Sequence, residues 1–379
     1  MYDLRQVNKK IPLPRSQHSV ATRPNSHYPE QLSAQKLDEN ENQQERELGI
    51  LVLLTVPFAW GSFEPAVRYV YAMDPPVPSL VFSFGYYLVA AVSLITSFII
   101  LRDQDATTDG LAIRGGSELG TYLFLGNWMQ VLGLKTTSSD RAAFILQLTT
   151  IFVPLVQAII QNDLQAIPRK TWGHCFLALL GVLVIGLDGK EGPLVEKVAH
   201  VLSSFSFGDL YITMAALFYT FHCIRLEKFA KAVPAAKLAA CKATTETILA
   251  LLALLTVFGL PEMNRDFNVA NDVRQEIVDF FQANSDINSD QRTLPAIAAV
   301  LWTGLVTVAY TIYAQSFGQA RVSPTDSNII YTIQPICTAA FAWALLGETL
   351  GIEGFLGGAL IGIAVFNVAT DDNVGDRKD

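Results

Sequence analysis

The chain has 379 residues, of which 51% are hydrophobic and only 16% are charged. A soluble protein carries about 25% charged residues, so this composition disfavours a soluble enzyme and favours a membrane protein. The formal net charge of −8 says little about ligands, because much of the acidity falls in polar segments. The four cysteines lie in apolar blocks without metal-ligand spacing, which predicts buried free thiols rather than a metal site or a disulfide framework.

Residues 1–47 contain no apolar run and are rich in Gln, Asn, Ser, Pro and charge, which predicts a disordered tail. No apolar signal region lies at the N-terminus, so a cleaved secretory signal is not expected. The basic character of residues 1–25 resembles a transit peptide, whereas the acidic stretch 38–47 argues against a long one. Plasma membrane and plastid envelope both stay open as locations.

About ten apolar blocks follow, each near the ~20 residues that a helix needs to cross a ~30 Å hydrocarbon core. They lie at 49–70, 79–101, 117–134, 141–161, 171–188, 207–225, 236–260, 294–315, 325–346 and 350–369. The blocks are continuous rather than alternating, and this pattern favours helices over a β-barrel. The sequence therefore predicts an all-α polytopic membrane protein with ten transmembrane helices.

The distribution of Lys and Arg predicts the orientation of these helices. With the N-terminus inside, and without the tail, the inner side receives 11 basic residues and the outer side 8. The loop "RLEKFAKAVPAAK" carries the clearest signal. Because inner loops are enriched in Lys and Arg, we expect both termini in the cytosol or the stroma.

The two halves of the chain resemble one another. "WMQVLGLKTTSS" (128–139) matches "YAQSFGQARVSP" (313–324), which aligns Gln130 with Gln315. "GVLVIGL" (181–187) matches "GALIGIA" (358–364) in the same order. Five helices in each copy place the second copy in the opposite orientation, and such inverted repeats are typical of secondary transporters with a midplane substrate site.

The predicted domains follow from this repeat. They are a disordered tail at 1–47, a first repeat at 48–188, a linker at 189–206, a second repeat at 207–370 and a short tail at 371–379. The second repeat contains a polar, acidic loop at 261–293, in which "DVRQEIVDFF" could form a surface helix.

Neutral polar side chains recur within the apolar blocks. In lipid they need partners, so they serve either as hydrogen bonds between helices or as the wall of a hydrated cavity. Matched amides in both repeats favour the cavity for the set as a whole. The predicted cavity residues are Asn127, Gln130, Gln147, Tyr219, Tyr310, Tyr313, Gln315, Asn328, Tyr331 and Gln334. Pro335 frees the carbonyl near Tyr331 and predicts a kink there.

Charged and titratable side chains within the blocks are the candidates for gating or proton coupling. These are Glu64, Arg68, His222, Lys242 and Glu246. Glu64 and Arg68 could pair at the outer interface, and His222 could be a packing residue. Aligning "WGSFEP" with "FYTFHC" instead places Glu64 opposite His222, as a carboxylate and an imidazole that could carry protons. Lys242 either extends to the inner surface or, if it faces the cavity, attracts an anionic substrate.

Several stretches together resemble one family. "WGSFEP" opens the first helix, "FGDLYITMAALFYTFHCIRLEKFAK" opens the second half, and "SPTDSNIIYTIQPICTAAFAWALLGETLG" follows later. They resemble EamA-type members of the drug/metabolite transporter superfamily, particularly the plant and algal branch, over about residues 48–370. The resemblance implies ten helices in two EamA repeats and alternating access through a central cavity. It implies no single substrate.

Three classes of function therefore compete. A secondary carrier for a small polar solute needs no cofactor, and the absence of a G-x-x-x-x-G-K-[ST] sequence argues against ATP drive within the chain. A membrane enzyme would need clustered His, Asp, Glu or Ser residues, and the five histidines are scattered. A receptor or scaffold would have no use for polar, kinked helices. We expect a carrier that contacts lipid and solute, with neither metal nor nucleic acid.

Gly354, Gly358 and Gly362 form a stripe suited to packing within the bundle or to a homodimer seam.

Overall fold

The structure is a computed structural model of the whole chain. It describes residues 28–63, 77–101, 106–134, 145–163, 167–188, 207–259, 268–283, 290–346 and 351–370, together with a few positions between 136 and 199. The chain divides into two compact units, residues 1–43 and 44–379. The helix packing and the cavity described below lie in the second unit.

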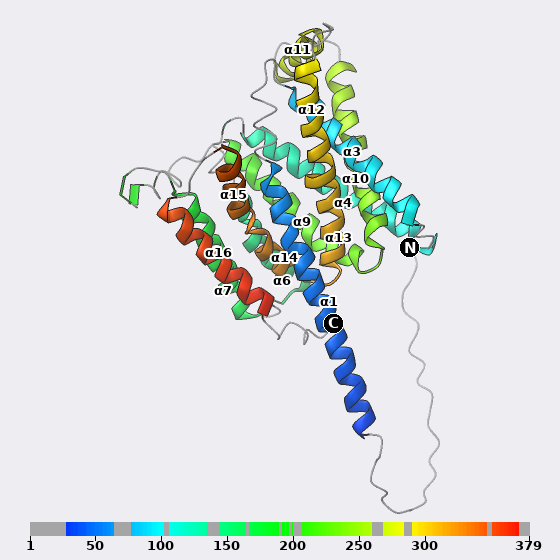
Figure 1. Cartoon of the computed structure of the whole chain (residues 1–379), viewed down its shortest axis with the longest axis vertical. Helices are drawn as coiled ribbons and strands as arrows, with labels where there is room; N and C mark the ends of the chain where they lie inside the picture. Colours follow the sequence, from blue (N-terminus) through cyan, green and yellow to red (C-terminus); the bar gives the residue numbers. More distant parts are fainter. Residues whose placement is uncertain are drawn as a thin grey trace, which may run out of the picture. The chain divides into compact units, whose positions relative to one another are not determined.

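Every regular element within the described segments is a helix (Figure 1). The first half contains α1 (Tyr28–Gly61), α3 (Ser79–Leu101), the short 3₁₀-helix η1 (Ala106–Thr108), α4 (Asp109–Leu134), α6 (Thr149–Gln161) and α7 (Arg169–Ile185). The second half contains α9 (Phe207–Ala230), α10 (Ala235–Gly259), α11 (Asn268–Ala283), α12 (Asp290–Trp302), the π-helix η2 (Thr303–Tyr310), α13 (Thr311–Gln319), α14 (Pro324–Tyr331), α15 (Gln334–Leu346) and α16 (Ile352–Thr370).

Residues 28–47 differ from the expected disorder, because they are helical and continue directly into the apolar part of α1. Two features account for the difference. Glu, Gln and Lys are good helix formers, and a helix that is already nucleated by a packed segment extends at little further cost. Residues 1–27 of the expected tail lie outside the described residues.

Five described helices are long and apolar enough to cross a membrane. They cover Ser79–Ile100, Phe207–Ala230, Ala235–Phe258, Leu294–Gln319 and Ile352–Thr370, and Ile145–Gln161 is a shorter apolar helix. The expected all-helical fold is confirmed, whereas the expected count of ten spans is not. The remaining blocks depart from a simple span: α4 carries Glu118, α7 has only 17 residues, and the block at 325–346 is broken into α14 and α15.

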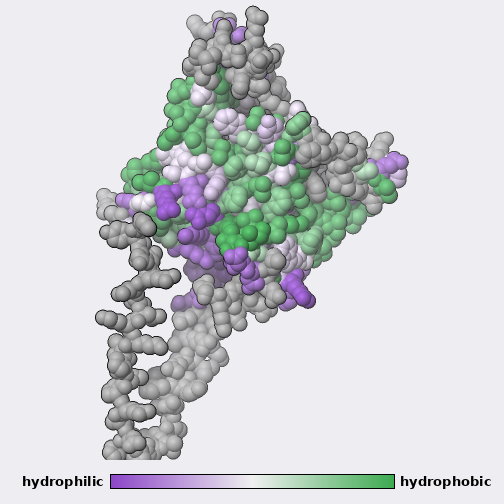
Figure 2. Space-filling view, turned by 180° about the vertical axis from the view of Figure 1, so that it is seen from behind, coloured by the Kyte–Doolittle hydropathy of each residue, from purple (hydrophilic) through white to green (hydrophobic). Residues whose placement is uncertain are grey.

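The outer surface of these helices is apolar. Large hydrophobic side chains are exposed on several helices, among them Ile100, Trp343 and Phe366, each at least 65% exposed. Figure 2 shows hydrophobic residues gathered over the described helices, with hydrophilic residues concentrated toward one end. Exposed apolar surface of this extent is unfavourable in water and is satisfied by lipid.

Close helix crossings hold the bundle together. The main packed pairs are α4 with α9, α4 with α10, α3 with α10, and α7 with α16. Where α7 crosses α16, a Cβ atom on Gly181 would lie 2.7 Å from the carbonyl oxygen of Gly357. The contact therefore needs glycine at both positions. The expected stripe plays a smaller part, because a Cβ on Gly362 would meet nothing within 4 Å.

Candidate functional site

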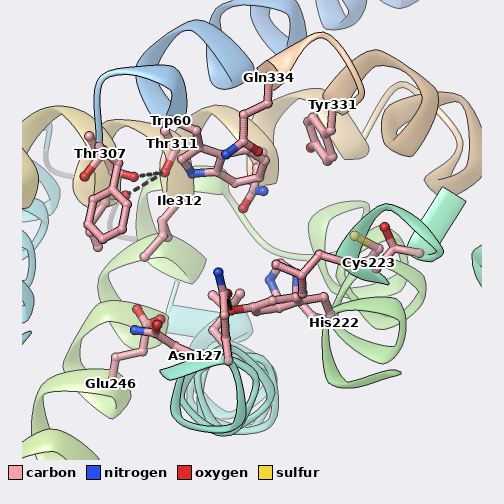
Figure 3. Close-up of a pocket in the computed structure, with 18 of the residues that line it drawn as sticks. Trp60, Asn127, His222, Cys223, Glu246, Thr307, Thr311, Ile312, Tyr331 and Gln334 are labelled. Atoms are coloured by element: carbon pink, nitrogen blue, oxygen red, sulfur yellow. Dashed lines mark hydrogen bonds between the residues drawn. The ribbon is translucent and has the colours of Figure 1, made fainter. Parts of the chain in front are cut away.

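A cavity of about 280 Å³ lies inside the second unit. Its wall takes residues from α1, α3, α4 and α6 in the first half of the chain, and from α9, α10, η2, α13, α14 and α15 in the second. Figure 3 shows Asn127, His222 and Glu246 on one side, facing Trp60, Thr311 and Gln334 across the open space. Both halves of the chain thus contribute polar side chains to one cavity.

Eight of the ten residues expected from the sequence line this cavity. They are Asn127, Gln130, Gln147, Tyr219, Gln315, Asn328, Tyr331 and Gln334. The amides Gln130 and Gln315, which the sequence comparison of the two halves aligned, are both in the set. Whether these side chains bind a solute stays a prediction.

Two hydrogen-bonded groups order the wall that α3, α4 and α9 form. The amide nitrogen of Asn127 donates to the hydroxyl of Tyr87 at 2.7 Å and to that of Tyr86 at 3.1 Å. The hydroxyl of Tyr219 donates to Oε1 of Gln130 at 2.9 Å. Buried polar groups held in this way stay fixed in direction, which favours selective binding over a loose aqueous pore.

The opposite wall is built where one expected helix is interrupted. α14 ends at Tyr331, two residues form a turn, and α15 begins at Gln334. Pro335 is the second residue of α15, where its missing N–H and fixed φ are tolerated, while it cannot continue the hydrogen bonding of α14. The expected kink is therefore a complete break, and Asn328, Tyr331 and Gln334 face the cavity beside it.

Aromatic packing holds Tyr331 at this break. Its ring packs edge-on against Trp60 of α1, with 5.2 Å between the centroids. Gln319 donates its amide hydrogen to the Tyr331 hydroxyl at 3.4 Å. At the start of α14, the side chain of Ser323 accepts the backbone N–H of Asp326 at 3.2 Å, and Pro324 occupies the first turn. This N-cap fixes the direction in which α14 enters the bundle.

Tyr310 and Tyr313, also expected in the cavity, lie elsewhere. Tyr310 is 40% exposed, and its hydroxyl lies 2.6 Å from the hydroxyl of Thr55 on α1. Tyr313 stacks on Phe317. The reason is the π-helix η2, which takes more residues per turn than an α-helix and therefore changes which residues face inward. Thr307 and Thr311 line the cavity instead.

The charged candidates divide into three groups. Glu64 and Arg68 lie outside the described residues. His222 and Glu246 line the cavity. Lys242 is fully buried, is not part of the lining, and shares the α10 helix with Glu246. Within the described part of the chain, Nε2 of His222, Nζ of Lys242 and Oε2 of Glu246 are buried without a hydrogen-bond partner.

Sequence reasoning missed several residues of the wall, among them five with polar or large aromatic side chains that bear on binding. Trp60, Tyr86, Tyr87, Thr307 and Thr311 all line the cavity. The Tyr86–Tyr87 pair inside an otherwise apolar block was a usable signal, because buried phenols need hydrogen-bond partners. The threonines gave no such signal, since each hydroxyl can bond to its own helix, as Thr307 and Thr311 do here.

The part of the chain that is described contains no group of side chains that could bind a metal ion. No three His, Cys, Asp or Glu side chains come together there in a way that could hold an ion. The wall instead offers amides, phenols, hydroxyls, one imidazole and one carboxylate, which are groups that bind a polar organic solute.

Comparisons with known proteins agree with this geometry. The EamA-like transporter family matches residues 278–370. A curated protein of Archaeoglobus fulgidus, described as an uncharacterized transporter, is 21% identical over 319 residues, which cover 84% of this chain and 85% of the relative. A solved structure, titled only "Crystal structure of protein", has a TM-score of 0.59 at 16% identity, and covers 86% of this chain and 98% of its own. That likeness concerns the fold alone.

The fold, the cavity and these matches define a multi-pass integral membrane transporter rather than an enzyme. Within that class, residues 278–370 are similar to the EamA-like transporters of the drug/metabolite transporter superfamily. The plant and algal branch expected from the sequence gains no support, because the curated relative is archaeal.

Proposed function

We propose that this protein is a secondary carrier that moves a small polar metabolite by alternating access through the central cavity. One observation carries the proposal. An apolar helical bundle encloses a space whose wall holds amides and phenols from both halves of the chain. Polar groups are unfavourable in a membrane unless they have a partner, and a solute that passes through is such a partner.

The carrier is built from two inverted repeats of five helices, which gives ten spans. The packing supports this proposal. α3 and α10, the second helices of the two repeats, pack on each other, and so do the fifth helices, α7 and α16. A two-fold axis that relates the halves brings equivalent helices together in this way. With five helices per repeat, the second repeat enters from the opposite face, and both termini are cytosolic.

Two ion pairs join helices near the end of the bundle that we propose to be cytosolic. Arg225 of α9 forms a two-pronged pair with Glu118 of α4, with Nη2 2.9 Å from Oε2. Arg321, after α13, pairs with Glu45 of α1 at 2.6 Å. These two helix pairs are equivalent under the proposed repeat. In the carrier cycle, they hold the cytosolic end closed, and they must separate for the cavity to open toward the cytosol.

The coupling ion in this proposal is the proton. His222 lies on the cavity wall, and an imidazole can take up and release a proton. Glu64 is its proposed partner from the matched position of the first repeat. A receptor or scaffold is the alternative, and it predicts a protein that binds but moves nothing.

Reconstitution in liposomes tests the carrier directly. Vesicles containing the purified protein, and protein-free vesicles, are incubated with a defined mixture of small polar metabolites, with and without a pH gradient. Mass spectrometry of the lumen should find at least one solute enriched only when the protein is present. Gln334→Leu should lower that uptake, whereas Gln275→Leu, a change of an exposed amide on α11, should not. If the lumen of both kinds of vesicle contains the same solutes, the carrier proposal is rejected and the receptor is favoured.

A further inference from the structure

The cavity wall has one acidic side chain among the residues that the structure describes. This is Glu246, near the middle of α10. Its side chain is almost fully buried, since the residue is only 3% exposed, and its Oε2 atom has no hydrogen-bond partner among the described residues. A buried carboxylate oxygen that accepts nothing is unfavourable, so it marks a place where a donor from outside the protein fits.

Aromatic rings surround this carboxylate. The phenols of Tyr86, Tyr87 and Tyr219 all lie within electrostatic range of Glu246. The rings of Tyr86 and Tyr87 pack at an angle, with 4.6 Å between their centroids. Their hydroxyls are held by the amide of Asn127, and the Tyr86 ring also packs against Phe63 and Phe82. Ring faces carry partial negative charge, so a carboxylate among them suits a cation.

The nearest basic side chain on α10, Lys242, does not line the cavity beside Glu246. Lys242 lies one turn before Glu246 on α10, and its Nζ atom makes no hydrogen bond within the described residues. It moderates the field of the carboxylate but is absent from the cavity lining. His222, on the wall beside it, also has a free Nε2 atom. The charge that a solute meets inside the cavity is therefore that of Glu246.

We propose that the solute carries a protonated amine or a similar small organic cation, and that its charged group binds Oε2 of Glu246. This inference rests on the proposed carrier function and names the class of its substrate. The amine supplies the donors that Glu246 lacks, and its carbon atoms contact the ring faces of Tyr86 and Tyr87. An anionic solute, which the sequence suggested if Lys242 faced the cavity, would be repelled by Glu246.

Three ligands of nearly equal size and different charge test the class. Benzylamine is a cation at pH 7, benzyl alcohol is neutral, and benzoate is an anion. Their binding to the protein in lipid nanodiscs is measured by calorimetry, with empty nanodiscs subtracted, and the series is repeated with butylamine, butanol and butyrate. In at least one series, the amine should bind at least tenfold more tightly than the alcohol, and the anion more weakly still. If neither amine binds more tightly than its alcohol, the inference is overturned.

Variants of Glu246 test the site. Glu246→Gln keeps the shape of the side chain but removes the charge, and it should reduce the advantage of the amine over the alcohol at least tenfold. Glu246→Asp should retain part of that advantage. Glu227→Gln, at a partly exposed position near the end of α9 and away from the cavity lining, is the control and should change nothing. An amine preference that persists in folded Glu246→Gln would overturn the assignment. If Glu246→Gln does not fold, the amine and the alcohol are compared in the wild type and in Glu246→Asp. An amine preference that is unchanged in Glu246→Asp would then overturn the assignment.

The two proposals fail separately. If amines bind through Glu246 but the metabolite screen finds no uptake, the cation site stands and the carrier falls. If vesicles accumulate neutral or acidic solutes and no amine binds, the carrier stands and the cation site falls.

Discussion

Tyr219 on α9 donates a hydrogen bond to Gln130 on α4 across 2.9 Å, and both side chains line the central cavity. The pair joins the two halves of the chain directly. The bond fixes the Gln130 amide by its oxygen, so its NH₂ group has a defined direction.

The first prediction concerns this bond. Tyr219→Phe removes the donor and leaves the Gln130 oxygen unpaired. A hydrogen bond between membrane helices contributes about 0.6 kcal/mol, and at most about 1.7 kcal/mol, so the fold should persist with a small loss of stability. Uptake in liposomes should fall about three- to tenfold, because the amide is no longer fixed. Tyr211→Phe, on the same helix but 42% exposed, is the control. Equal uptake by both variants would show that the bond only packs the helices.

The second prediction concerns the contact between α7 and α16. Gly181→Ala places a methyl group 2.7 Å from the carbonyl oxygen of Gly357, and overpacking of this kind costs about 1–3 kcal/mol. The thermal midpoint of the protein in detergent should fall. Gly173→Ala lies on the same helix, where a methyl group would meet nothing within 4 Å, and it should be neutral or stabilising. If Gly181→Ala has the same thermal midpoint as Gly173→Ala, α7 and α16 can move apart without loss of stability.

The sequence predicted the chemistry of the wall better than its geometry. Gln130, Asn328 and Gln334 were identified because amides inside apolar blocks need a reason to be there. Tyr310 was misplaced because helical periodicity assumes 3.6 residues per turn, whereas η2 is a π-helix. The break before Gln334 was foreseen as a kink at Pro335. Its extent depends on tertiary contacts, such as that of Tyr331 with Trp60, which a local pattern cannot contain.

Membrane spans were harder to count than to detect. Ser79–Ile100, one of the segments that qualify as spans, contains no charged side chain. α4 has a similar length but carries Arg114 and Glu118, because one end of it forms ion pairs with other helices. Hydropathy cannot separate a span with functional charges from a helix at the surface.

The third prediction concerns the ion pair of Glu118 and Arg225. Its side chains are 23% and 31% exposed, so solvent screens the interaction, and its coupling energy should be about 1 kcal/mol. Glu118→Gln and Arg225→Gln should each lower the thermal midpoint, and the double variant should lower it by less than the sum. High salt should weaken the coupling.

The same variants test the proposed cytosolic closure. If the pair holds the cavity closed, both single variants should raise the reactivity of Cys223, which lines the cavity, toward a thiol reagent supplied from the cytosolic side. Unchanged labelling alongside a measurable coupling energy would make the pair structural only. Cys175, which is buried away from the cavity lining, provides the background reactivity.

The last prediction concerns the two charges on α10. Lys242 and Glu246 are four residues apart and fully or almost fully buried, and each has a polar atom without a hydrogen bond within the described residues. Replacing a poorly satisfied buried pair by neutral side chains of similar volume often stabilises a protein by about 1–4 kcal/mol, whereas removing one partner destabilises it. Lys242→Met with Glu246→Gln should therefore raise the thermal midpoint, while each single change lowers it. Lys231→Met with Glu227→Gln removes a partly exposed pair of the same spacing at the C-terminal end of α9 and should change stability by less than about 0.5 kcal/mol. The stabilised double variant should no longer prefer amines. In this proposal, the carboxylate of Glu246 lowers the stability of the protein and also binds the amine. A double variant less stable than the wild type would instead mean that the charges on α10 hold the bundle together.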